Sequence, residues 1–129
     1  MLRLIAVCSL MLVGSLAVQA ADSVANRDDV QRWIAKLDDD KFSAREDATR
    51  HLIMPRHKDA AIQGIVNAAE KGSPEARRRA LHILSAWYRS GGAESRKAIV
   101  ATAKRWQAAK NPRLVPLGIE LWAKMSVFF

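Results

Sequence analysis

The stretch from Ser73 to Leu84 reads SPEARRRALHIL and holds both a helix start and the beginning of an apolar stripe. Serine is a favoured N-cap residue, proline fits the first helical turn, and glutamate favours the positive end of the helix dipole. Ala80, Leu84 and Trp87 then recur at helical spacing. The sequence therefore predicts an amphipathic helix that reaches roughly Ser90.

An earlier stretch repeats this pattern. Residues 42–52 read FSAREDATRHL. Four positions are shared by the two stretches, namely Ala44 with Ala76, Arg45 with Arg77, Ala48 with Ala80, and Leu52 with Leu84. A small residue at the alanine position allows a paired helix to approach closely. A looser third copy places Gly118 at the small position and Trp122 at the leucine position.

Helical periodicity continues on both sides of these stretches. We expect further helices at about 28–37, 58–71, 93–109 and 112–127, with breaks at Pro55, Gly72, Gly91-Gly92 and Asn111-Pro112. Ser43 with Glu46 predicts a capping box for the second helix. Since these segments all show helical periodicity, the chain is predicted to be all-α. Short connections make successive helices antiparallel, which predicts three helix pairs at about 28–53, 58–90 and 93–127.

The two repeated stretches resemble the second helices of HEAT-like repeats, of the phycobilisome-lyase type found in exported planctomycete proteins. The resemblance covers roughly residues 28–84. It implies a short right-handed α-solenoid whose second helices line a concave side, with Arg45 and Arg77 bracing one repeat against the next. In the third copy Val115 stands where this arginine is expected, so the last pair is either a true repeat or a terminal cap.

The N-terminus has the features of a signal peptide. Arg3 precedes an apolar run from Leu4 to Val18, and small residues follow at Ala20 and Ala21. We expect cleavage after Ala20, which gives a signal peptide at 1–20 and one domain at 21–129. The run is too short to span a bilayer, which favours a cleaved signal peptide over a membrane anchor. No integral membrane span is expected after cleavage. The predicted location is periplasmic or extracellular, in a bacterium, and residues 21–129 contain no cysteine for a disulfide.

Positive charge is concentrated in the second half of the chain. The whole sequence carries a formal charge of +8, yet residues 21–57 are close to neutral. From Lys58 onward, thirteen Lys or Arg residues face five Asp or Glu residues. The asymmetry indicates either an anionic partner for this half or a contribution to solubility alone.

Signals for catalysis are weak. His51, His57 and His82 lack the spacing of a metal-binding pair, and the three aspartates at 38–40 lack the pattern of a calcium loop. Ser43 and Ser73 are explained as caps, and no phosphate-binding loop or nucleophile elbow is present. We therefore predict no catalytic residue, metal or cofactor. The four tryptophans, Trp33, Trp87, Trp106 and Trp122, lie on apolar stripes and are predicted to pack in the core.

A surface is the remaining candidate for function. The side of the fourth helix away from its apolar stripe, with neighbouring second helices, predicts a basic concave face made of Arg50, Arg78, His82, Ser85, Arg89 and Lys124. The resulting hypothesis is an exported, non-enzymatic binding or scaffold module for a protein or another anionic envelope component. Nucleic acid is disfavoured because no aromatic residue interleaves the basic stripe. The alternative is a lyase-like or hydrolase-like enzyme with an unrecognised site.

Overall fold

The protein is helical throughout the part that its computed structural model describes, residues 27–54 and 58–127. A helix at residues 27–36 is followed by α2 (Phe42–Ile53), α3 (Lys58–Lys71), α4 (Pro74–Ser90), α5 (Ala93–Ala108) and α6 (Leu114–Ser126). The predicted all-helical class is confirmed. The predicted signal peptide at residues 1–20 lies outside the described residues, as do Pro55 and His57.

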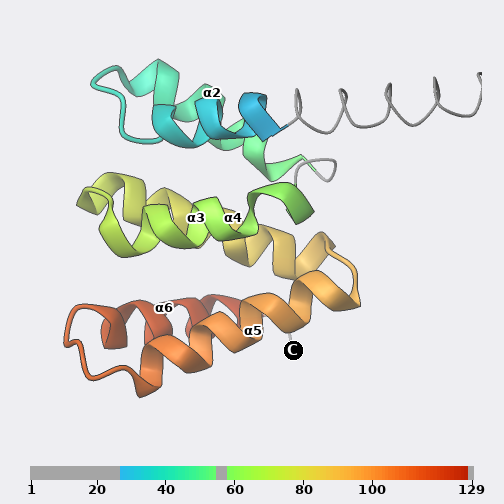
Figure 1. Ribbon diagram of the computed structural model, residues 1–129, viewed down its shortest axis with the longest axis vertical. Coiled ribbons are helices and arrows are strands. Elements are labelled where there is room, and N and C mark those ends of the chain that lie inside the picture. Colours follow the sequence, from blue (N-terminus) through green and yellow to red (C-terminus); the bar gives the residue numbers. More distant parts are fainter. Residues whose placement is uncertain (1–26, 55–57, 128–129) are drawn as a thin grey trace, which may run out of the picture.

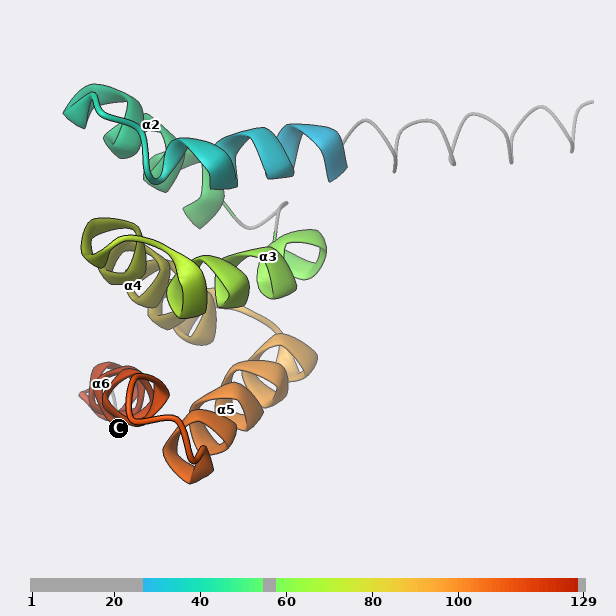
Figure 2. The same cartoon turned by 60° about the vertical axis from the view of Figure 1, so that its left-hand side comes forward.

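The described helices lie in three tiers, each made of two consecutive helices (Figure 1). The helix at 27–36 lies with α2, α3 lies with α4, and α5 lies with α6. Contacts between tiers join α2 to α4 and α4 to α6 on one side, and α3 to α5 on the other, while the consecutive helices α2 and α3, and α4 and α5, also touch. The second helix of each tier therefore belongs to one layer and the first helix to another (Figure 2). Helix α4 is central, since it contacts α2, α3, α5 and α6.

Helix α4 begins as the sequence predicts. Ser73 is its N-cap, and the Ser73 hydroxyl oxygen accepts a hydrogen bond from the backbone N–H of Ala76 at 3.2 Å. Pro74 occupies the first turn, and the Ser73 hydroxyl donates to Asp38 in the tier before. The residues that start α4 thus also tie it to the first tier.

The predicted capping box of α2 is wrong. Lys41 occupies the N-cap position, the helix begins at Phe42, and no side chain caps it. Asp39 instead accepts a hydrogen bond from the backbone N–H of Lys41 at 2.9 Å, and the helix begins two residues earlier than predicted. Ser43 therefore lies inside the first turn.

Arginine side chains bind carbonyls at the ends of preceding helices and in the turns that follow them. Arg77 Nε donates to the carbonyl of Ala69 at 3.2 Å, and Arg96 Nε donates to that of Tyr88 at 3.0 Å. Arg45 Nη1 donates to the carbonyls of Asp39 and Asp40 at 2.7 and 3.0 Å. The last carbonyls of a helix lack partners within it, and a left-handed glycine often helps to satisfy them. No residue in the described ranges has positive φ, and arginine bonds serve these turns instead.

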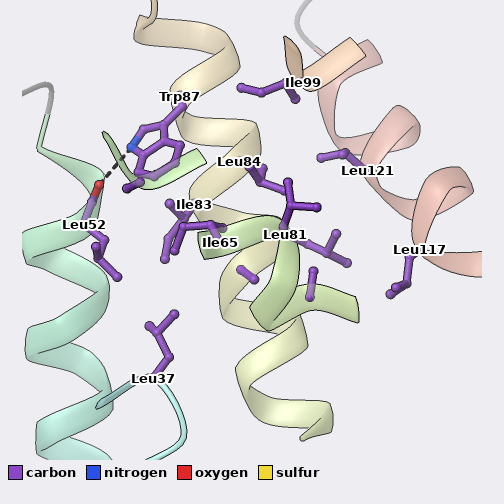
Figure 3. Packing of buried hydrophobic residues seen from close by; sticks show 14 of the residues in the cluster. Leu37, Leu52, Ile65, Leu81, Ile83, Leu84, Trp87, Ile99, Leu117 and Leu121 are labelled. Carbon is purple, nitrogen blue, oxygen red and sulfur yellow. Dashed lines mark hydrogen bonds between the residues drawn. The ribbon is translucent and has the colours of Figure 1, made fainter. Parts of the chain in front are cut away.

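Buried apolar side chains join the first two tiers (Figure 3). Trp87 on α4 is fully buried, and its indole Nε1 donates to the carbonyl of Leu52 on α2 at 2.8 Å. The other repeated apolar positions, Ala48, Ala80 and Leu84, are likewise fully buried. The repeated small and leucine positions therefore form the contact between the second helices and the rest of the core.

The tryptophans do not all share this environment. Trp106 is fully buried, and Trp33 is half-buried against His51, with ring centroids 3.9 Å apart. Trp122 is 42% exposed, so its predicted core position is wrong. Trp122 takes the place that Leu84 has in the middle tier. In the described part of the chain no further helix pair packs over α6 to cover it.

Gly118 is expected to tolerate no side chain. A Cβ there would lie 2.8 Å from the backbone carbonyl oxygen of Ala103 and 2.8 Å from the backbone N of Gln107. Alanine normally stabilises a helix interior by about 1 kcal/mol over glycine. Forcing α5 and α6 apart costs about 1–3 kcal/mol, so Gly118→Ala should lower the free energy of unfolding measured in urea.

The matched control is Gly92→Ala, because a Cβ at Gly92 meets no atom within 4 Å. Its effect should stay within about 0.5 kcal/mol. A stabilised Gly118→Ala variant would show that α5 and α6 are not in the close contact described here.

Candidate functional site

A pocket of about 360 Å³ opens on the layer of second helices, and all three tiers contribute to it. Helix α2 supplies Glu46 and Thr49, and α6 supplies Lys124. The remaining lining residues come from α4, and they are Glu75, Arg78, Arg79 and His82. The stacking of the second helices therefore brings charged groups that are distant in sequence into one site.

Arg79 lies buried at the bottom of the pocket, with only 8% of its surface exposed. Its Nη1 donates to Glu46 Oε1 at 2.7 Å and to the Thr49 hydroxyl at 3.0 Å. Its Nε donates to Glu75 Oε1 at 2.8 Å. A buried guanidinium requires such partners, and these bonds neutralise it. Arg79 is therefore part of the architecture of the pocket and has few donors left for a ligand.

Several positively charged side chains surround Glu75. It accepts hydrogen bonds from Arg79 and Arg78, and Arg45 Nε lies 3.9 Å from its Oε1. Desolvation raises the pKa of Glu75, but the hydrogen bond and charge of Arg79 together with those of Arg78 outweigh it. The pKa therefore lies below its ordinary value, and the carboxylate is ionised near neutral pH.

His82 is exposed at the rim of the pocket. Desolvation lowers its pKa, and the charges of Arg89, Lys124 and Arg79 lower it further, while Glu46 acts in the opposite direction. The pKa of His82 therefore lies below its ordinary value of 6.5. The imidazole is mostly neutral at pH 7 and offers one donor and one acceptor.

The structure brings together some of the predicted binding residues. Arg78, His82 and Lys124 all line the pocket. Arg50 and Arg89 are exposed but do not line it. Ser85 must be removed from the predicted face, because it is 3% exposed and its hydroxyl donates to the carbonyl of His82. Because α4 contacts four other helices, more of its surface is buried than a single apolar stripe indicates.

Arg79 was not predicted as part of the site. It lies at helical spacing from Ala76 and Ile83, so it belongs to the buried side of α4. An arginine on an apolar stripe requires acidic partners, so the position of Arg79 on this stripe is the sequence feature that could have identified it. Its partner Glu46 lies on another tier, so the sequence alone does not identify the pair.

Several polar groups of the pocket are committed to the fold. The Thr49 hydroxyl donates to the carbonyl of Arg45 at 2.9 Å and accepts from Arg79. Glu46 and Glu75 both accept hydrogen bonds from Arg79. Arg78, His82 and Lys124 are the other charged or titratable residues that line the pocket.

Arg45 and Arg77 lie outside this group. Arg77 binds a carbonyl within its own tier, and Arg45 does the same while also lying near Glu75 of the next tier. Arg113, in the connection between α5 and α6, donates from Nη2 to the carbonyl of Gly72 at 3.5 Å, so it links the third tier to the second.

Comparisons of the chain with protein-family models, curated proteins and solved structures found no match. Within residues 27–54 and 58–127, no three His, Cys, Asp or Glu side chains are grouped so that they could hold a metal ion. In the same ranges, no helix combines the length and apolar character needed to cross a membrane.

Proposed function

We propose that this chain is an exported binding module, a short right-handed α-solenoid of HEAT-like repeats, that holds an anionic partner on its second-helix layer. The observation that carries the proposal is the pocket to which α2, α4 and α6 all contribute. In solenoids, stacked second helices form extended surfaces that serve binding. Three tiers with their second helices on one side are consistent with this architecture.

The arrangement of charge supports an anionic partner. Arg79 is paired internally, whereas Arg78 has a side chain that is 71% exposed. In the described part of the chain, no acidic side chain lies within ion-pair distance of Lys124. These cations face solvent from different tiers and would meet a negatively charged surface together.

An acidic protein or another anionic component of the cell envelope fits the pocket better than nucleic acid does. Single-stranded nucleic acids are bound by basic grooves that also present aromatic side chains for stacking. The pocket is lined by no aromatic residue and contains two carboxylates.

The test is retention of envelope components by immobilised protein. The double variant Arg78→Gln with Lys124→Gln should retain acidic proteins about tenfold less than the wild type, a difference of about 1.4 kcal/mol. The bound proteins are identified by mass spectrometry. Thermal melts followed by circular dichroism check that both proteins are folded.

The matched control removes the same charge from the other layer. Lys97 and Lys104 are exposed on α5, and Lys97→Gln with Lys104→Gln should leave retention unchanged. Equal losses in the two double variants would mean that net charge, rather than the pocket, determines binding. Undiminished retention by the pocket variant would refute the proposed site.

A further inference from the structure

We infer that the pocket takes a single carboxylate group from its partner between Arg78, His82 and Lys124, and that binding draws a proton onto His82. This inference rests on the function proposed above and specifies the chemistry of the same site. Its consequence is that affinity for the partner increases as the pH falls from neutral towards 5.

The first argument is the balance of charge in the pocket. Three cations, Arg78, Arg79 and Lys124, face the two carboxylates of Glu46 and Glu75. With His82 neutral, the pocket carries an excess of one positive charge. One carboxylate balances that excess.

The second argument is the position of the donors. Arg79 donates hydrogen bonds to Glu46, Thr49 and Glu75 within the fold. Arg78 shares one bond with Glu75 but remains largely exposed, and Lys124 approaches from α6. His82 lies on the same rim. The donors that face the opening therefore come from two helices and can converge on one group.

The third argument concerns the charges around His82 from every helix packed near it. Helix α4 itself places Arg79 and Arg89 nearby, α6 places Lys124, and α2 contributes Glu46. Cations outnumber the single carboxylate, which lowers the pKa of His82 together with desolvation. A bound carboxylate adds the missing negative charge and raises that pKa.

Linkage gives the sign of the effect. If the bound state has the higher His82 pKa, binding takes up a proton, and protonation strengthens binding by the same factor. The pKa of His82 lies below 6.5 in the folded protein without a partner. The affinity should therefore increase as the pH falls below 7. At still lower pH the carboxylate of the partner is protonated, so the affinity should pass through a maximum.

The test uses a defined probe, a peptide of alternating Glu and Gly with blocked ends, so that side chains supply its only carboxylates. Calorimetric titration of the mature protein at about pH 7.5 and about pH 5.5 should show about fivefold tighter binding at the lower pH. His82→Gln should remove this dependence, so that its affinity is the same at the two pH values. The NMR titration of the His82 ring should shift to higher pH when peptide is added.

A matched control accompanies the test. His51→Gln changes an imidazole that stacks on Trp33 outside the pocket, so the pH dependence should persist. The same pH dependence in wild type and His82→Gln would overturn the inference.

The outcomes separate this inference from the proposed function. If the Arg78 and Lys124 double variant loses its acidic partner but wild-type peptide binding does not depend on pH, the binding module stands and only the protonation of His82 is refuted. If that double variant keeps the partner, the proposed site itself fails.

Discussion

Replacement of Trp87 by alanine is expected to lower the free energy of unfolding by about 3–5 kcal/mol. The side chain is fully buried between α4 and α2, so its removal leaves a cavity in the contact between the first two tiers. It also leaves the carbonyl of Leu52, near the end of α2, without its indole donor. Urea denaturation at neutral pH measures the loss.

Two further variants separate packing from hydrogen bonding. Trp87→Phe keeps most of the apolar volume but removes the donor to Leu52, so it should retain more stability than Trp87→Ala. Trp122→Ala removes the same side chain from a site that is 42% exposed, and its cost should be the smallest of the three. A larger loss for Trp122→Ala than for Trp87→Ala would show that the tier contact is misplaced.

Arg79→Met should lower the free energy of unfolding by about 3 kcal/mol. Breaking a buried charge pair by removing one partner costs about 3–5 kcal/mol, because the other charge is left uncompensated. Here the carboxylates of Glu46 and Glu75 are partly exposed and can recover some hydration, so the lower end applies. The control Arg78→Met removes an exposed pair to the same Glu75 and should cost under about 1 kcal/mol.

The pH dependence of the Arg79→Met variant provides a second measurement. The pKa of Glu75 is held below its ordinary value of 4.5, so its contribution to stability is present above that pH and is lost as the pH falls through the native pKa. Removing Arg79 moves the pKa of Glu75 upward and reduces this contribution. The difference in stability between wild type and variant should therefore narrow below about pH 4.5. A difference that stays constant into acid would mean that Arg79 acts through packing alone.

Local rules were sufficient for much of the secondary structure. Ser73, Pro74 and Glu75 start a helix by chemistry that needs no tertiary partner, and the structure confirms that start. The pair Gly91-Gly92 separates α4 from α5 as predicted. The repeated small positions at Ala48 and Ala80 were informative because packing against another helix constrains their size.

The errors arose where neighbouring tiers decide the environment. Ser85 is buried because α4 packs against four other helices, a property that its own sequence pattern does not contain. Trp122 is exposed because α6 is not covered in the way that α4 is. The pair of Arg79 with Glu46 depends on how two tiers stack. Half of the predicted binding residues line the pocket, since helical periodicity fixes the direction of a side chain but not its neighbours.

The arginines that bind backbone carbonyls change what the formal charge of +8 means for a partner. Arg45, Arg77 and Arg96 contribute to that total, yet their hydrogen bonds are directed at the chain's own turns. They add to the distant electrostatic field, but part of their hydrogen-bonding capacity is used within the fold. The dependence of binding on salt concentration should accordingly reflect the few cations around the pocket, and it should be much weaker than the total charge suggests.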